Sequence, residues 1–115
     1  MLIELSVENF RSIRERQTFS MVAAPRLLKG KENKFTPKVK GERFPALLKV
    51  AAIYGPNASG KSTLVFAFNV LAKLTRQKPT TEKVPFEVAP FRFDDSLLEQ
   101  PSRIEVHFID RKSVV

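Results

Sequence analysis

Hydrophobic and polar residues alternate in two segments near the start of the chain, residues 1–8 and 17–23. In the first segment Ile3, Leu5 and Val7 share one side, and the residues between them are polar or acidic. This period of two is typical of a strand with one buried face and one solvated face. Because only a short polar stretch separates the two segments, we expect an antiparallel pair joined by a turn.

A mostly hydrophobic run at residues 47–54 predicts a third strand, and its nearly continuous apolar character is typical of a strand buried on both faces. From Ser62 the chain continues to Leu74 without Gly or Pro. This predicts a helix that ends near residues 76–78, ahead of the next proline. The predicted stripe that faces the core consists of Leu64, Val65, Phe68, Leu71 and Ala72.

Alternation returns at residues 103–109, which predicts a half-exposed strand. The sequence His-Phe-Ile-Asp at its end superficially resembles the acidic motif of nucleotide-binding proteins, but that motif follows an all-apolar buried strand. We therefore expect residues 110–112 to form a hairpin turn. We also expect a turn at residues 94–96, and either a short edge strand or a packed loop at residues 91–93.

The sequence GPNASGKST, from Gly55 to Thr63, lies between the strand predicted at 47–54 and the helix that follows. Gly55, Gly60, Lys61 and Ser62 fill every fixed position of the phosphate-binding pattern G-x-x-x-x-G-K-[ST]. Glycines allow the backbone to curl around phosphates, so that its amides and the positive end of the helix point at the anion. The alternative is a glycine-rich turn that binds nothing.

Within this loop, Lys61 is the candidate catalytic residue, because its ammonium would reach the β- and γ-phosphates of a triphosphate. The hydroxyl of Ser62 is the candidate ligand of Mg²⁺. The predicted nucleotide-binding residues of the loop are Gly55, Pro56, Asn57, Ala58, Ser59, Gly60, Lys61, Ser62 and Thr63. The predicted cofactors are ATP and Mg²⁺.

The chain has 115 residues, of which 43% are hydrophobic, and this is enough for one domain or a piece of one. It contains no Cys, which excludes disulfides, Cys zinc sites and thiol nucleophiles. Acidic residues interrupt the first apolar stretch, so no signal peptide is visible, and no apolar run approaches the length of a membrane span. We expect a soluble, cytoplasmic protein without membrane partners.

The formal net charge is +8, and it is unevenly distributed. Between residues 26 and 43 there are seven basic and two acidic residues, so this part carries more than half of the excess. Residues 25–45 show no clear period and are expected to form a basic loop within the domain. The loop is either a solvated connector or a patch that binds DNA or RNA phosphates, and the second option makes a nucleic-acid-binding module the alternative function.

Three stretches together resemble a known family: L-x-x-x-x-V-x-N-F-R-S at 2–12, T-F-S-M-V at 18–22 and L-L-K-V-A-A-I-Y-G-P-N-A-S-G-K-S-T-L at 47–64. They are similar to the N-terminal segment of SMC/RecF-like, ABC-type ATPases. Within these, the chain most resembles the bacterial AAA family ATPases found near OLD-type and abortive-infection proteins. Residues 90–94 and 101–108 also resemble that group, so the similarity covers nearly the whole chain.

The resemblance implies the N-terminal portion of an α/β P-loop NTPase, an ABC/RecF-like head with antiparallel strands beside a mixed sheet and one helix after the phosphate loop. It also implies ATP binding in an ATPase of DNA metabolism or phage defence. By this resemblance the residues Asn9, Phe10, Arg11 and Ser12 lie near the base and ribose of the nucleotide. Taken alone, these four residues equally suit a polar turn with a buried Phe.

Full members of the group carry a second acidic motif (Walker B), a signature helix and a switch His, and two heads enclose ATP as a homodimer. None of these motifs is identifiable here. We therefore expect residues 1–115 to be a partial ATP-binding domain that lacks the C-terminal remainder of the head. Because phosphoryl transfer needs groups beyond Lys61 and Ser62, we expect this chain alone to bind nucleotide weakly and to hydrolyse it poorly or not at all.

Overall fold

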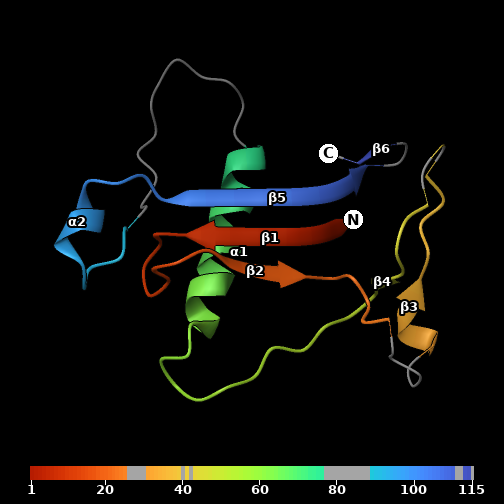
Figure 1. Cartoon of the computed structure of the whole chain (residues 1–115), viewed down its shortest axis with the longest axis horizontal. Helices are drawn as coiled ribbons and strands as arrows, with labels where there is room; N and C mark the ends of the chain where they lie inside the picture. Colours follow the sequence, from red (N-terminus) through yellow and green to blue (C-terminus); the bar gives the residue numbers. More distant parts are fainter. Residues whose placement is uncertain (26–30, 40, 42, 77–88, 111–112, 115) are drawn as a thin grey trace. The chain divides into compact units, whose positions relative to one another are not determined.

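The computed structural model describes residues 1–25, 31–39, 41, 43–76, 89–110 and 113–114 (Figure 1). It has two compact units: Met1–Leu5, Thr18–Ile53 and Glu105–Val115 form the first, and Ser6–Gln17 and Tyr54–Ile104 form the second. The elements are β1 (Leu2–Glu8), β2 (Gln17–Ser20), η1 (Lys31–Asn33), β3 (Lys34–Phe35), β4 (Leu47–Leu48), α1 (Lys61–Arg76), α2 (Asp95–Leu98), β5 (Arg103–Asp110) and β6 (Ser113–Val114).

The main sheet has the strand order β2-β1-β5-β6, and β1 runs antiparallel to both of its neighbours (Figure 1). Ile3, Leu5 and Val7 are buried, as their alternation predicts. The predicted strand pair and the predicted strand at residues 103–109 are therefore confirmed. β5 also pairs antiparallel with β6, with Asp110 opposite Ser113. Residues 111–112 of the expected hairpin turn lie outside the described residues.

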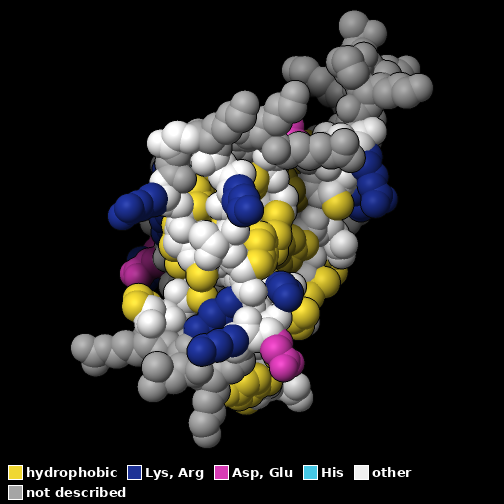
Figure 2. Space-filling view, turned by 90° about the vertical axis from the view of Figure 1, so that its right-hand side faces the viewer, with side chains coloured by type: hydrophobic (Ala, Val, Ile, Leu, Met, Phe, Trp, Pro, Cys, Tyr) yellow, Lys and Arg dark blue, Asp and Glu magenta, His cyan; other side chains and the backbone are white. Residues whose placement is uncertain are grey.

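A second, two-stranded sheet pairs β3 with β4 in antiparallel fashion. It lies partly in the basic segment, so the prediction of a loop throughout residues 25–45 is wrong at 31–35, where η1 and β3 form. Residues 26–30, 40 and 42 lie outside the described residues. On the β3 and β4 side of Figure 1, Lys and Arg side chains surround hydrophobic ones, and few acidic side chains are in view (Figure 2).

The strand expected at residues 47–54 is much shorter than predicted, because only Leu47–Leu48 forms a strand, β4. The side-chain amide of Asn33 ends the ladder by accepting from the amide of Val50 at 2.8 Å and donating to its carbonyl oxygen at 2.7 Å. The expectation of a strand buried on both faces is also wrong, since Val50 is 68% and Tyr54 92% exposed. A strand is buried on both faces only between covering layers, and among the described residues no strand pairs with 49–54.

The helix predicted after the glycine-rich loop is confirmed as α1, which begins at Lys61 and ends at Arg76. Its buried residues are Thr63 and Ala67, whereas Val65 is exposed, so the predicted core stripe is wrong at Val65. Ala67 follows Thr63 by four residues, and the pair therefore defines the buried side of the helix. No helix among the described residues is long and apolar enough to cross a membrane.

The turn expected at residues 94–96 is instead the start of a short helix, α2. Asp94 has extended backbone dihedrals, and its carboxylate accepts from the amide of Ser96 at 3.1 Å. This is the geometry of a helix N-cap, a position that Asp favours for the same reason that it favours turns. Residues 91–93 form no strand, and the rings of Phe91 and Phe93 meet edge to face at 5.7 Å.

Candidate phosphate-binding loop

The sequence GPNASGKST folds as a tight connection into the N-terminus of α1, within the second unit. Two of its residues have positive φ angles, Ala58 at 63° and Gly60 at 93°. The amide of Ser59 bonds back to the carbonyl oxygen of Pro56 at 3.4 Å. This local curl turns the chain just before α1 begins, as the phosphate-loop pattern predicts.

Gly55 has no positive φ, and its role is explained by space instead. A Cβ atom at Gly55 would lie 2.9 Å from the hydroxyl oxygen of Ser59, which is closer than real Cβ contacts. The missing side chain of Gly55 therefore leaves room for the Ser59 side chain, while Gly60 supplies the unusual backbone angle.

The N-terminus of α1 presents amide donors, and the first turn of the helix supplies no competing anion. The first hydrogen bond of the helix runs from the amide of Leu64 to the carbonyl oxygen of Gly60 at 3.1 Å. The amides of Lys61, Ser62 and Thr63 precede it and have no acceptor inside the helix. The first turn contains no acidic residue, so no carboxylate of its own neutralises the positive end of the helix dipole.

The ammonium group of Lys61 folds back over the loop. It donates to the carbonyl oxygens of Gly55 at 2.5 Å and Pro56 at 2.6 Å, and it lies 3.4 Å from the hydroxyl of Ser59. These acceptors are uncharged, so among the described residues dipoles solvate the positive charge and no carboxylate pairs with it. An anion in the loop offers this ammonium stronger, charge-assisted hydrogen bonds.

A pocket of about 270 Å³ is lined by Ser12 and residues 57–63. Pockets for drug-sized ligands usually enclose roughly 300–1,000 Å³. The cavity lies just below this range, and the phosphate chain is the part of a nucleotide that it would hold. The lining residues include one lysine and several hydroxyl-bearing side chains, and these residue types carry the donors that phosphate oxygens need.

Asn9 and Phe10 support the fold next to this pocket without lining it. Phe10 is 1% and Asn9 3% exposed. The Asn9 amide nitrogen donates to the carbonyl oxygens of Leu97 and Gln100, each at 3.0 Å, and its amide oxygen accepts from the backbone of Phe91 at 3.0 Å. The donors and the acceptor of this side chain are thus used for hydrogen bonds within the protein.

Arg11 and Ser12 follow in the same turn but face α1. The guanidinium carbon of Arg11 lies 3.8 Å from the centre of the Phe66 ring. The hydroxyl oxygen of Ser12 lies 2.5 Å from that of Thr63. The sequence gives no sign of this hydroxyl pair, because its members lie 51 positions apart and neither residue type signals a long-range contact.

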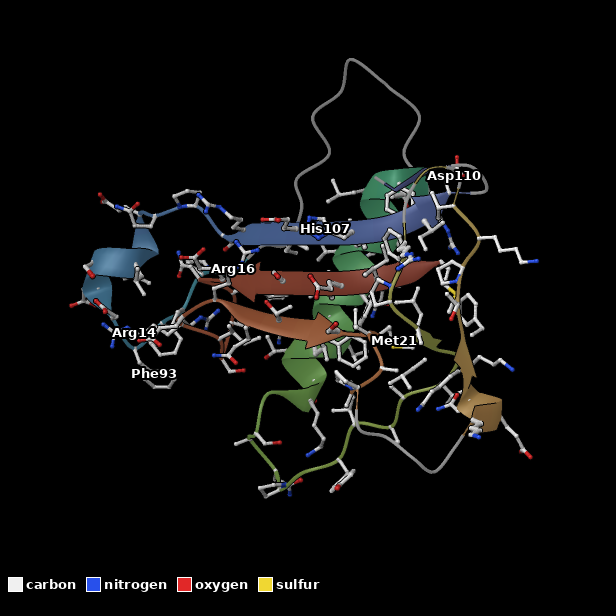
Figure 3. All side chains as sticks on the ribbon, turned by 45° about the vertical axis from the view of Figure 1, so that its right-hand side comes forward. Arg14, Arg16, Met21, Phe93, His107 and Asp110 are labelled. Atoms are coloured by element: carbon white, nitrogen blue, oxygen red, sulfur yellow. The ribbon has the colours of Figure 1, made fainter. Side chains whose placement is uncertain are left out.

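A second pocket, of about 410 Å³, lies beside the same turn, with Glu8, Arg14 and Arg103 in its lining. Both arginines are already paired, Arg14 with Asp94 at 2.7 Å and Arg103 with Glu8 at 3.8 Å. Figure 3 shows Arg14 and Phe93 near α2, where the first of these pairs forms. Among the described residues, no group of three or more His, Asp and Glu side chains is arranged to hold a metal ion.

Residues 50–115, more than half of the chain, match the family described as "AAA domain, putative AbiEii toxin, Type IV TA system". The comparisons with curated proteins and with solved structures give no match. The matched region includes the loop Gly55–Thr63 and all of α1. On this match, and with a phosphate-loop sequence that opens into a helix, the chain belongs to this AAA domain family of nucleotide-binding ATPases.

Proposed function

We propose that this chain binds the phosphate chain of ATP in the loop Gly55–Thr63, as the N-terminal part of an ATPase of the DNA-metabolism or phage-defence type. The observation that carries the proposal is the pocket at the start of α1, which is lined by Ser12 and residues 57–63, Lys61 among them, next to a first helical turn without an acidic residue. Such a site attracts anions, and its size suits phosphates.

In this proposal Lys61 exchanges the carbonyl oxygens of Gly55 and Pro56 for oxygens of the β- and γ-phosphates. The exchange is favourable because charged acceptors form hydrogen bonds roughly twice as strong as neutral ones. The flexible four-carbon stem of Lys61 allows its ammonium to move without a change of the backbone.

Mg²⁺ fits the same site when it arrives with the nucleotide. Mg²⁺ in nucleotide sites keeps several waters and binds through phosphate oxygens and one or two protein oxygens. The hydroxyl of Ser62, which is exposed in the first turn of α1, would supply one protein oxygen. Because the described residues contain no acidic cluster, we expect metal binding to depend on the nucleotide.

RecF/SMC-like, ABC-type and OLD-related ATPases use two heads around ATP, and the resemblance of residues 2–12 and 47–64 to them supports the same arrangement here. A cytoplasmic location agrees with this role. The alternative, nucleic-acid binding through the basic residues 26–43, falls partly outside the described residues and stays a prediction.

The test is calorimetric titration of the chain with Mg-ATP, with Lys61→Ala as the variant and Lys73→Ala as its control. Both substitutions remove one positive charge from α1, but Lys73 lies in the last turns of the helix. We expect Lys61→Ala to weaken binding about tenfold or more, the effect of losing hydrogen bonds to a charged group. Lys73→Ala should change affinity less than about twofold. Equal effects of the two variants would argue against the loop as the site.

A further inference from the structure

The turn after β1 is fixed in place by many backbone contacts within the second unit. Phe10 and Ile13 exchange two backbone hydrogen bonds of 2.9 Å, and the amide of Arg11 donates to the carbonyl oxygen of Ala89 at 2.7 Å. The hydroxyl of Ser102 donates to the carbonyl oxygen of Asn9 at 2.5 Å. Ser12, which follows Arg11 in this turn, is therefore held in place facing α1.

Ser12 reaches the phosphate loop from this support. Its hydroxyl oxygen lies 2.5 Å from that of Thr63 in the first turn of α1, and 4.0 Å from the position that a Cβ atom on Gly60 would take. Ser12 also lines the 270 Å³ pocket, and every other residue of that lining belongs to the loop itself. Ser12 thus forms a wall of the pocket opposite the loop.

The two hydroxyl groups carry two protons, and the bond between them uses only one. Thr63 is 5% exposed, whereas Ser12 is exposed and borders the pocket. When Thr63 donates to Ser12, the proton of Ser12 is free to point into the pocket. Thr63 then orients the Ser12 hydroxyl as a donor for an oxygen bound in the loop.

We propose that Ser12 is a phosphate-contacting residue, whose hydroxyl, oriented by Thr63, donates a hydrogen bond to a phosphate oxygen held in the loop Gly55–Thr63. This inference rests on the proposed function and adds a donor from outside the loop sequence and outside the matched region 50–115. It differs from the placement implied by the resemblance, in which the turn contacts the base and ribose.

The experiment compares two ligands, Mg-ATP and inorganic tripolyphosphate with Mg²⁺, which has neither base nor ribose. Ser12→Ala should weaken both by the same factor, about tenfold, because one hydrogen bond to a charged group is lost. Ser12→Thr, which keeps a hydroxyl, should bind both ligands within about twofold of the original chain. Ser20→Ala is the matched control, because Ser20 also donates to another side chain, at 3.1 Å to Glu4, but lies in the first unit.

The possible results distinguish a failure of this inference from a failure of the proposed function. Binding of both ligands by the original chain with no change in Ser12→Ala overturns the role of Ser12 and leaves the loop as the site. A loss confined to ATP overturns it in favour of a contact to the base or ribose. If the original chain binds neither ligand, the proposed function fails and the inference fails with it. Equal thermal midpoints of Ser12→Ala and Ser20→Ala show that a loss of affinity is not a loss of folding.

Discussion

Arg11 stacks on Phe66, with its guanidinium carbon 3.8 Å from the centre of the ring. The contact joins the turn after β1 to α1, the helix that follows the phosphate loop. Phe66 lies one helical turn beyond Ser62. Because a planar guanidinium is weakly hydrated, it stacks on an aromatic ring with little loss of solvation. Together with the bond between Ser12 and Thr63, this contact sets the position of α1 against the turn.

A double-mutant cycle with Arg11→Ala and Phe66→Ala should therefore give a coupling free energy of about 0.5–1 kcal/mol, the range for exposed cation–π pairs. The measurement is urea unfolding of the four proteins. Arg11→Lys is the control, since an ammonium keeps the charge but loses the planar stacking. A coupling indistinguishable from zero would mean that the two residues do not stack in solution.

Asn9 is expected to be the most sensitive residue of the turn. Its buried amide serves three backbone groups, and Asn9→Ala leaves all three without a partner. The expected loss is about 2–4 kcal/mol of the free energy of unfolding, measured by urea denaturation. Asn69→Ala, on the exposed surface of α1, is the matched control and should change stability by less than about 0.5 kcal/mol. Comparable losses would contradict the buried role of Asn9.

Gly60 and Gly41 provide a matched pair for the backbone of the loop, with φ angles of 93° and 89°. Alanine at either position should destabilise the fold by about 1–2 kcal/mol, because side chains with a Cβ atom rarely adopt such angles. Only Gly60→Ala should also weaken Mg-ATP binding, since relaxation of its backbone turns the loop amides away from the pocket. A similar loss of affinity in Gly41→Ala would show that affinity merely follows stability.

The pKa of Asp94 is held below its usual value, first by the hydroxyl of Ser96, which donates to its carboxylate at 2.6 Å, and also by Arg14. A lowered folded-state pKa contributes stability that is present above the unfolded pKa of about 3.9 and is lost as the pH falls through the folded value. Asp94→Asn keeps an acceptor for the N-cap but removes the charge. Urea midpoints measured from neutral to acidic pH should therefore fall more steeply below about pH 4 in the original chain than in the variant. Parallel curves would contradict this.

The sequence predicted the elements that depend on local patterns. The alternation around Ile3, Leu5 and Val7 located β1, and the absence of Gly and Pro after Ser62 located α1 within one residue at its start. Three fixed positions of the phosphate-loop pattern, Gly60, Lys61 and Ser62, line a pocket, and phosphate binding there stays a prediction. β1 and α1 are predicted correctly because short-range periodicity and backbone freedom determine them.

Local patterns do not predict the features that depend on partners distant in the sequence. Residues 49–54 have the composition of a buried strand, but Asn33 ends the ladder at Val50 through its side chain. Nothing in the sequence near Ser12 indicates that it meets Thr63. The N-cap role of Asp94 was missed because an Asp followed by Ser suits a turn and a helix start equally well.

The most direct test of the phosphate-binding loop is a titration of the ¹⁵N-labelled chain with Mg-ATP, followed through the backbone amide resonances. If the loop holds the phosphates, the largest shifts occur at Asn57–Thr63 and at Ser12, the residues that line the pocket. Shifts concentrated in residues 31–35, with the loop amides unchanged, would contradict phosphate binding at the start of α1.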